Sequence, residues 1–287
     1  MAKSRQHQTW DDVFQIPQDI AVESLNTGYI TGTKEGMFNV HSEAYQNQYS
    51  FKNAKLPVLA HLISYKNKYY LVDTGFDSSF SQRSGGSFKG LLSPFYFRNR
   101  YFQSDSSLGI EKQLEAKEIT LDTVFLTHAH EHSAGLGTID NTIPLVMGIG
   151  ERDINFFPFV YSTNIKSRED IRYLDFSVNG IDMPLLGSCI DVFHDGSLWA
   201  IDTHGHTKGH VSYLINGVNR TVLIAGDASN NSLGFSIGVE TGTYNENITY
   251  SKISFDKLIK FAKAYPQVDI VFGHEVPGLF DIEYMKL

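Results

Sequence analysis

The sequence predicts an α+β fold in which many short strands are flanked by a few helices. The first observation is a series of short apolar runs bounded by turn residues, for example 57–63, 69–72 and 211–215. The second is residues 251–264, where apolar side chains recur at helical spacing. The third is size, because 287 residues, 41% of them hydrophobic, can bury a large core. Since no linker-like stretch interrupts the chain, we predict a single domain over residues 1–287.

The N-terminal part predicts one short strand and then a hairpin. The strand is expected at 20–22, after a short amphipathic stretch. The runs 57–63 and 69–72 predict two buried strands, and the polar residues 66–68 between them predict the hairpin turn. The second strand leads into residues 73–75, Asp-Thr-Gly, which alone is ordinary turn chemistry.

Residues 77–107 follow no strict period of 2 or 3.6 and mix aromatic side chains with Ser, Gly and Arg. Two interpretations stay open for this aromatic-rich insertion. It forms a lid or the wall of a substrate pocket, as loops between motif-bearing elements often do. Alternatively it packs onto the core or onto a second subunit, which would make the protein a homodimer.

The rest of the chain alternates short strands with three helices. Strands are expected at 123–126, 143–147, 190–193, 198–201, 211–215, 221–225 and 269–272. One helix is expected at 108–118 with Ile110 and Leu114 facing inward, and another begins at 151–155 and must end at Pro158.

The helix at 251–264 has the clearest pattern of the three. Ser254 is predicted to cap it, and Pro266 to end it. Its buried face is predicted to consist of Leu258, Ile259 and Ala262.

Charge and cysteine content exclude several classes of protein. A formal net charge of −8 and a pI of about 5.7 disfavour the phosphate attraction on which nucleic-acid binding depends. The single cysteine, Cys189, rules out an internal disulfide and a thiolate metal site, and its apolar neighbours predict a packed thiol. No apolar run reaches the roughly 18 residues of a membrane helix, so we expect no membrane insertion. The polar N-terminus predicts a cytoplasmic protein, with an exported parent whose signal has been removed as the alternative.

Residues 127–135, Thr-His-Ala-His-Glu-His-Ser-Ala-Gly, contain three histidines at alternate positions directly after an apolar run. In an extended segment, side chains two residues apart point to the same side. Imidazole is the commonest metal ligand, and three protein ligands with one open position is the catalytic zinc arrangement. The alternative is a polar loop with chance histidines.

Candidate ligands recur at the ends of later strands. Three further histidines lie in 204–210 before a strand, Asp227 ends the strand at 221–225, and His274 ends the strand at 269–272. Seven of the 11 histidines therefore lie in three short stretches, which favours a metal site over chance.

These motifs resemble those of the metallo-β-lactamase-fold hydrolase superfamily, most closely the branch that contains N-acyl-homoserine lactonases. The motifs in order are Asp73-Thr74-Gly75, Thr127-His128-Ala129-His130, Asp195-Gly196-Ser197, Gly205-His206-Thr207-Lys208-Gly209-His210, Gly226-Asp227 and Gly273-His274. The resemblance implies a four-layer αββα sandwich with metal ions at one edge between the two sheets.

By position, the resemblance implies a ligand set for two metal sites. The first site takes His128, His130 and His210, Asp227 is the bridging carboxylate, and His274 serves the second site. Asp73 is implied to lie just outside the ligands and to orient one of them, and His206 to shape the loop.

The chain departs from the superfamily in its first histidine motif. Members usually carry His-x-His-x-Asp-His, whereas residues 128–133 read His-Ala-His-Glu-His-Ser. Aligned without a gap, His132 takes the Asp position and Ser133 the final His position. Aligned with one residue deleted, Glu131 replaces Asp and His132 keeps its role, and this alignment fits residues 133–136. In both alignments His132 is a ligand of the second site.

The resemblance and the residues together predict a metal-dependent hydrolase. Its cofactor is expected to be zinc, one or two ions, with iron or manganese as alternatives. A metal-bound hydroxide would attack the carbonyl of a small ester, lactone or amide, with Asp227 positioning the nucleophile and Glu131 or His132 handling protons. Lactonases of this branch often carry a tyrosine three residues after the bridging aspartate, where this chain has Asn230.

Two other functions remain as alternatives. One is a mononuclear iron oxygenase of the persulfide-dioxygenase type, with His128, His210 and Asp227 as its two-histidine, one-carboxylate site. The other is a metal-impaired, non-catalytic relative, which the altered first histidine motif suggests.

Overall fold

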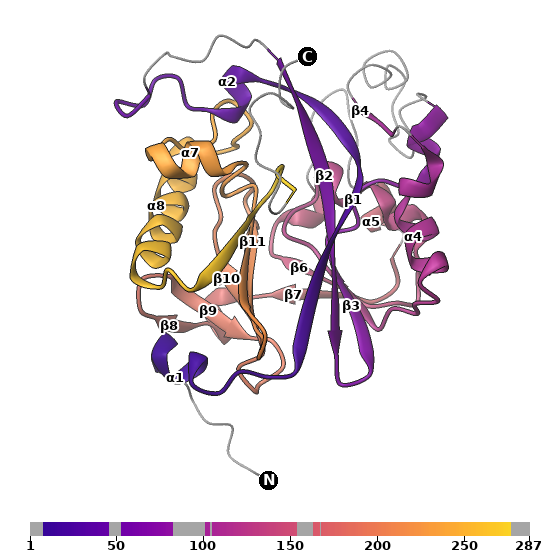
Figure 1. Ribbon diagram of the computed structural model, residues 1–287, viewed down its shortest axis with the longest axis horizontal. Coiled ribbons are helices and arrows are strands. Elements are labelled where there is room, and N and C mark those ends of the chain that lie inside the picture. Colours follow the sequence, from indigo (N-terminus) through magenta and orange to yellow (C-terminus); the bar gives the residue numbers. More distant parts are fainter. Residues whose placement is uncertain are drawn as a thin grey trace.

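The computed structural model describes residues 8–45, 53–82, 101–103, 105–153, 163–166 and 168–276, and within these two mixed β-sheets lie face to face (Figure 1). The first sheet, in spatial order, consists of β4 (Tyr101–Phe102), β1 (Ile20–Thr33), β2 (Asn53–Tyr65), β3 (Lys68–Val72), β5 (Thr123–Phe125), β6 (Leu145–Gly148) and β7 (Ile171–Leu174). The second consists of β13 (Val268–Phe272), β12 (Thr221–Gly226), β11 (Val211–Asn216), β10 (Leu198–Asp202), β9 (Gly187–Asp191) and β8 (Ile181–Met183).

The direction of the strands brings distant residues to one edge of the sandwich. In the first sheet, β3 runs parallel to β5, so the residues after both strands emerge at the same edge. In the second sheet β12 runs parallel to β13, with the same consequence. Asp73, His128, Asp227 and His274 each follow the end of one of these four strands.

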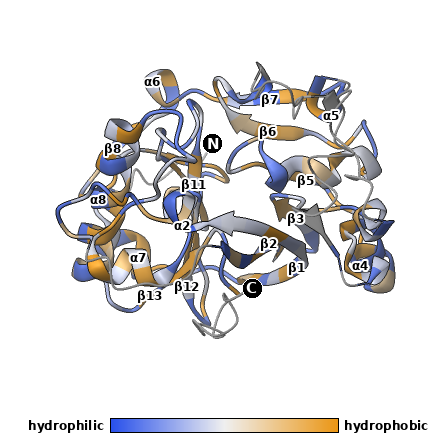
Figure 2. Cartoon of the chain, turned by 90° about the horizontal axis from the view of Figure 1, so that it is seen from above, coloured by the Kyte–Doolittle hydropathy of each residue, from blue (hydrophilic) through white to orange (hydrophobic). Residues whose placement is uncertain are grey.

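Helices cover the outer faces of both sheets, and apolar clusters between and outside the sheets hold the sandwich together. Between the sheets, Ile63 and Phe125 of the first sheet pack with Tyr213 and Ile224 of the second. Helix α4 (Ile110–Ala116) covers the first sheet, and α1 (Trp10–Phe14) and α8 (Ile248–Ala264) cover the second. Figure 2 shows α4 and α8 on opposite sides of the molecule with the strands between them. The predicted αββα sandwich is confirmed.

Shorter helices lie in the connections. The α-helices are α2 (Lys34–Met37), α5 (Thr163–Lys166), α6 (Phe176–Asn179) and α7 (Ser232–Ile237). The 3-10 helices are η1 (Ser78–Gln82), η2 (Ser106–Leu108), η3 (Glu131–Thr138) and η4 (Glu151–Asp153). Among the helices that the structure describes, none combines the length and the apolar character needed to span a membrane.

Most predicted strands are confirmed, but the strand at 20–22 was much too short. Strand β1 runs for 14 residues and pairs with β2 along its length, with a register shift beside Gly28. Its later half carries Thr, Asn and Gly, so its apolar alternation is weak, and pairing with a neighbour rather than composition extends it. The hairpin turn between β2 and β3 is confirmed, because Lys66 and Asn67 have the positive φ angles, 51° and 59°, that a two-residue turn needs.

The predicted helix at 251–264 is confirmed, but its cap was wrong, and of its predicted buried face only Leu258 is fully buried. The helix α8 begins at Ile248, and the side chain of Asn247 caps it by accepting the backbone N–H groups of Thr249 and Tyr250. Ser254 instead lies in the helix interior and donates its hydroxyl to the carbonyl of His204 at 2.8 Å. The buried side chains of α8 are Ser251, Ser254, Phe255, Leu258 and Phe261, whereas Ile259 and Ala262 are only partly buried.

Some predictions concern residues that the structure does not describe. Much of the aromatic-rich insertion, and Pro158 with most of the helix expected from 151, lie outside them. At the start of the insertion, Phe80 is fully buried and stacks on Phe76 with ring centroids 4.1 Å apart, so this side chain belongs to the core. Cys189 is fully buried, as predicted for a packed thiol, and burial raises its pKa.

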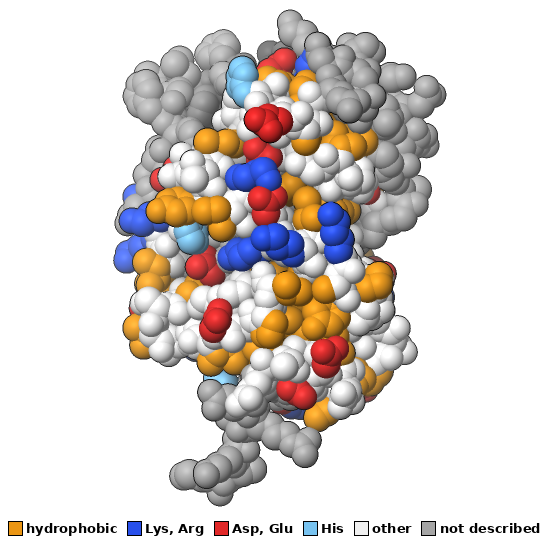
Figure 3. All heavy atoms as spheres, turned by 90° about the vertical axis from the view of Figure 1, so that its left-hand side faces the viewer, with side chains coloured by type: hydrophobic (Ala, Val, Ile, Leu, Met, Phe, Trp, Pro, Cys, Tyr) orange, Lys and Arg blue, Asp and Glu red, His pale blue; other side chains and the backbone are white. Residues whose placement is uncertain are grey.

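The surface over α8 carries charges of both signs. Lys252 pairs with Asp256 one turn further along the helix. Figure 3 shows positive and negative side chains next to one another on this face, interrupted by small apolar areas. Such a mixed surface is what an acidic chain without a basic cluster is expected to show.

Candidate metal centre

Seven ionisable side chains from both sheets converge at the edge of the sandwich. They form two groups in which the potential ligand atoms lie within 4.8 Å of one another. The first group is His128, His130 and His206, and the second group is Glu131, His132, Asp227 and His274. All seven are buried, and Glu131 and His130, at 9% and 8% exposed, are the most accessible of them. These two residues are therefore the members of the groups nearest to solvent.

The first group consists of imidazoles alone. Nδ1 of His130 lies 3.1 Å from Nε2 of His206. Nδ1 of His128 lies 3.0 Å from the hydroxyl of Thr127, which leaves Nε2 of His128 facing the centre. Burial lowers the pKa of His128 well below its ordinary value and the pKa values of His130 and His206 to about 4. These three rings are neutral at pH 7 and can offer lone pairs to a cation.

The second group combines two carboxylates with two histidines. Oδ1 of Asp227 lies 3.6 Å from Nε2 of His132, and Oδ2 of Asp227 lies 3.4 Å from Nε2 of His274. Oε1 of Glu131 lies 3.6 Å from the same His274 nitrogen. Nδ1 of His274 donates to the carbonyl of Pro57 at 2.8 Å, which fixes the orientation of its ring. This neighbourhood matches the alignment in which one residue is deleted and Glu131 stands for the missing aspartate.

Asp227 also lies against the first group. Its Oδ2 is 3.4 Å from Nε2 of His206 and 3.8 Å from Nε2 of His128. Burial alone would raise the pKa of Asp227, but the nearby His274, His206 and His132 lower it well below its ordinary value. One carboxylate is thus placed between the two groups, as a bridging ligand would be.

Asp73 lies behind the second group, where the resemblance implied an orienting residue. Its carboxylate accepts the backbone N–H and the hydroxyl of Thr127, both at 2.7 Å, and its Oδ2 lies 3.3 Å from Nδ1 of His132. Its φ of 62° is uncommon for a residue other than glycine, and such backbone strain gathers at functional sites. Although burial lowers the pKa of His132, the carboxylates of Asp73, Asp227 and Glu131 outweigh it and raise that pKa to about 9.

His206 belongs to the first group, and His210 lies beside that group. The ring centroid of His210 is 5.4 Å from that of His128 and 5.9 Å from that of His206. Nε2 of His210 accepts the backbone N–H of Asp227 at 3.0 Å, and Nδ1 of His210 lies 2.9 Å from the hydroxyl of Thr203.

Glu151 is a buried residue of this region that the sequence did not single out. Its carboxylate accepts the hydroxyl of Thr207 at 2.6 Å and the backbone N–H groups of Gly209 and Ala129 at 2.9 Å and 2.8 Å. It therefore ties the loop of the first two histidines to the loop 204–210. Burial raises its pKa to about 7. A polar residue directly after the strand-end pair Ile149-Gly150 was the only indication in the sequence.

The donor set fits divalent metal ions. Nε2 of His128, Nε2 of His132 and Oδ1 of Asp227 are buried without a hydrogen-bond partner among the described residues. Unpartnered buried polar atoms are costly, and a cation would satisfy all three. Imidazole nitrogens with carboxylate oxygens are the ligands that zinc takes in catalytic sites, and iron and manganese accept the same set.

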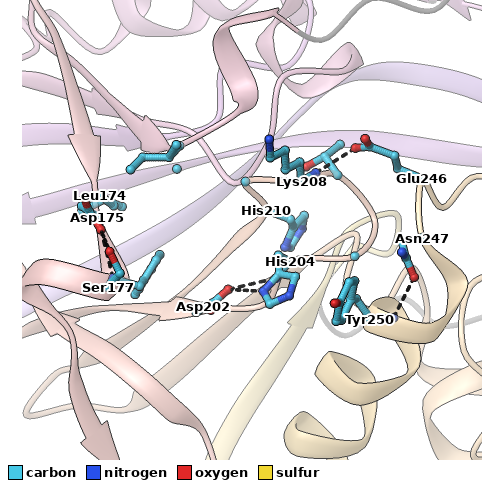
Figure 4. Close-up of a pocket in the computed structure, with 16 residues that line it drawn as sticks. Leu174, Asp175, Ser177, Asp202, His204, Lys208, His210, Glu246, Asn247 and Tyr250 are labelled. Carbon is cyan, nitrogen blue, oxygen red and sulfur yellow. Dashed lines mark hydrogen bonds and ion pairs between the residues drawn. The ribbon is translucent and has the colours of Figure 1, made fainter.

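A cavity of about 480 Å³ lies beside the loop 204–210 (Figure 4). Its wall includes His204 and Lys208 of the loop, Leu174 at the end of β7, Phe176 at the start of α6, and Tyr250 of α8. It touches His210 but none of the seven residues of the two groups.

Comparison with protein families gives one match over most of the chain. The family model described as the metallo-beta-lactamase superfamily matches residues 54–274. That range contains every residue of both groups.

Similar proteins and structures support the same architecture. Over 120 residues the chain is 29% identical to the cytochrome P450 monooxygenase mpaDE of Penicillium brevicompactum, which covers 38% of this chain and 13% of that protein. The chain thus spans about an eighth of the length of that relative. The fold resembles a quorum-quenching N-acyl homoserine lactone lactonase with a TM-score of 0.69, 16% identity, and 94% and 99% of the two chains covered. It also resembles a probable metal-dependent hydrolase from Staphylococcus aureus (TM-score 0.63, 18% identity, 90% of each chain covered) and the dizinc quorum-quenching lactonase AidC (TM-score 0.61, 15% identity, 94% of each chain covered).

Proposed function

This chain belongs to the metallo-beta-lactamase superfamily, and from that premise we propose that its buried centre binds zinc and hydrolyses a small carboxylic ester, most readily a cyclic ester. The observation that carries the proposal is the position of Asp227 between an all-histidine group and a mixed group. Zinc bound there would polarise a carbonyl group and make water a nucleophile at neutral pH.

Glu131 is the residue that we assign to proton transfer. Its carboxylate is the more exposed of the two in the centre, so it lies nearer to solvent than that of Asp227. It would accept a proton from the water that attacks the carbonyl carbon and return that proton to the leaving oxygen as the ester C–O bond breaks. The products are a carboxylic acid and an alcohol, which form one hydroxy acid when the substrate is a lactone.

The substrate class follows from charge and from the named neighbours. A net charge of −8 disfavours polyanionic substrates. Structural neighbours are described as lactonases, which supports a lactone over an amide. Asn230, three residues after Asp227, is buried, and neither polar atom of its amide has a hydrogen-bond partner among the described residues. This amide could contact a polar group of the substrate, and it makes acyl-homoserine lactone itself less favoured than other lactones.

A hydrolysis assay with controlled metal content tests the proposal. Protein stripped by a chelator and reloaded with zinc is expected to hydrolyse a simple γ-lactone and an aryl ester, and the stripped protein is not. Glu131→Gln is expected to keep its zinc and lose turnover by roughly 10²–10⁴-fold, the usual contribution of general acid–base catalysis. No turnover of any ester or lactone by fully zinc-loaded protein would contradict the proposal. One bound iron with oxygen consumption would replace it with the oxygenase alternative.

A further inference from the structure

We propose that Glu151 is a positioning residue of the metal centre, whose carboxylate holds the loops 127–135 and 204–210 at the separation that metal binding requires. This inference rests on the proposed metal centre, but it concerns the frame of the site and not the reaction. Glu151 belongs to neither group of candidate ligands, and it lies just after β6, on neither of the two loops.

The two oxygens of Glu151 are divided between the two loops. Oε2 accepts the backbone N–H of Ala129 at 2.8 Å. Oε1 accepts the hydroxyl of Thr207 at 2.6 Å and the backbone N–H of Gly209 at 2.9 Å. Each of these donors is adjacent in sequence to a histidine of the first group or to His210. Because a carboxylate group is rigid, it fixes the distance between the donors, and through them the distance between the histidines of one loop and those of the other.

The end of β6 packs closely enough against the loop 204–210 for Glu151 to reach it. A Cβ atom on Gly148 would lie 1.9 Å from the carbonyl oxygen of Gly209, and one on Gly209 would lie 2.5 Å from the carbonyl oxygen of Ile149. Glycine permits such a close approach of two backbones. The loop is therefore packed against the segment that contains Glu151, which leaves it little room to shift.

Glu151 is also a buried charge without a positive partner. It is fully buried, and within the described parts of the chain it takes part in no ion pair. Burial of a carboxylate is costly even when hydrogen bonds satisfy its oxygens. Cations bound by the neighbouring histidines would offset this charge. Such a placement is expected of a carboxylate that supports metal ligands, and not of a residue that serves packing alone.

Other contacts join the two loops without Glu151. The backbone N–H of Val211 donates to the carbonyl of Thr127 at 2.9 Å, and the hydroxyl of Tyr213 donates to the carbonyl of Leu126 at 3.0 Å. Both contacts lie where the loops meet their strands, β5 and β11. We therefore expect the fold to survive a change at Glu151, while the loops lose their fixed separation.

Glu151→Gln tests the proposal with little change in size or shape. An amide offers one oxygen and one NH₂ group, so in either orientation the backbone N–H of Ala129 or of Gly209 faces a second donor. Metal-free wild-type protein, Glu151→Gln and the control Glu246→Gln are titrated with zinc against a chromophoric chelator, with circular dichroism to verify folding. Glu246 is exposed and accepts the backbone N–H of Lys208 at 2.9 Å, so the control removes a carboxylate that contacts the loop 204–210 from outside.

Glu151→Gln is expected to weaken zinc binding by roughly 10–100-fold, as loss of a residue that orients metal ligands does. It is also expected to change the visible absorption spectrum of the cobalt-substituted protein, because the geometry of the ligands changes. Glu246→Gln is expected to leave both unchanged. A purely structural role would instead make the metal-free protein less resistant to urea and leave the zinc affinity and the cobalt spectrum at their wild-type values. That result would overturn the proposal.

Thr207 provides a second test if Glu151→Gln does not fold. Thr207→Val removes one donor at nearly constant size and is expected to weaken zinc binding by about tenfold. Thr207→Ser keeps the hydroxyl and is expected to keep the wild-type affinity. Wild-type affinity in Thr207→Val, or equal losses in both variants, would contradict the proposal. Because none of these readouts uses a substrate, the expected losses of zinc in a protein that hydrolyses nothing would contradict the proposed function alone.

Discussion

The two groups of the metal centre lie side by side, but the pKa values of their histidines are shifted in opposite directions. In the first group burial lowers the pKa of His128, His130 and His206, so the rings are neutral. In the second group the carboxylates overcome burial and raise the pKa of His132 to about 9 and that of His274 above its ordinary value. The first group can therefore accept a cation directly, whereas in the second a cation must replace protons. One sheet edge thus offers two chemically different sites.

The largest effect is expected from removing the residue that both groups share. Asp227→Ala takes away the carboxylate between the groups and a charge that raises the pKa values of His132 and His274. Hydrolysis should fall by more than the roughly 10–100-fold that loss of an outer hydrogen-bond partner costs. The measurement is kcat/KM with excess zinc, together with the zinc content. Asp182→Ala, an exposed carboxylate on β8, is the matched control and should leave both unchanged.

If Asp227→Ala kept two tightly bound zinc ions, the shared-ligand arrangement would be wrong. If it lost activity and kept one zinc, the two groups would be separable, as their different chemistry suggests.

The next prediction separates the groups through their supporting residues. Asp73→Asn removes the charge beside Nδ1 of His132, whereas Thr127→Val removes a hydroxyl that contacts both Nδ1 of His128 and Oδ2 of Asp73. Asp73→Asn is expected to weaken binding of the second zinc ion by roughly 10–100-fold, and Thr127→Val is expected to weaken binding of both ions. Stepwise zinc titration distinguishes the two outcomes. Equal weakening of both ions by Asp73→Asn would show that the groups behave as one site.

The sequence could predict which side chains of the second group converge, but not how the rings of the loop 204–210 are oriented. His132, Asp227 and His274 follow strand ends, so periodicity and strand direction suffice to bring them together. His206 and His210 lie four residues apart in one loop, and periodicity cannot say which ring turns inward. That choice depends on Asn245, Thr203 and Ser212, whose hydrogen bonds only the folded chain reveals.

Contacts between segments distant in sequence also explain the errors in the predicted fold. Strands with continuous apolar runs, such as β11 and β12, were correctly located because both of their faces are buried. Strand β1 and the N-terminus of α8 were misjudged since pairing with β2 and capping by Asn247 decide them. Glu151 was overlooked because its three donors come from two loops distant in sequence.

Because the histidines of the two groups have different pKa values, the affinity for each zinc ion is predicted to depend differently on pH. With a pKa of about 9, His132 holds a proton at pH 7 that zinc must displace. The affinity of the second ion should therefore rise with pH, by about tenfold per unit below pH 9. The first ion should show no such rise above pH 5, because its ligands are already neutral. Calorimetry in buffers of different ionisation enthalpy measures the protons released, and proton release on binding of both ions would contradict the contrast.

The smallest expected effect concerns His204, the histidine of the loop that belongs to neither group. Its Nδ1 lies 2.7 Å from Oδ1 of Asp202 at the edge of the cavity (Figure 4). This contact raises the pKa of His204 above 6.5, and, although burial opposes it, lowers that of Asp202 below 3.8. A raised histidine pKa stabilises the fold below pH 6.5 and loses that effect as the pH rises through the folded pKa. A lowered aspartate pKa stabilises it above pH 3.8 and loses the effect as the pH falls.

The stabilisation from this pair is therefore expected to be greatest between these values, near pH 5.5. Because the pair is partly exposed, His204→Gln should cost less than about 1 kcal/mol there. At pH 9 the variant and the wild type should differ less, since the histidine is then losing its charge. Urea unfolding of the metal-free proteins measures both values, and an equal difference at the two pH values would mean that packing and not charge sets it. If zinc binding is also unchanged in His204→Gln, a position in the loop 204–210 is not sufficient to make a histidine part of the metal centre. The centre then consists only of the buried residues of the two groups.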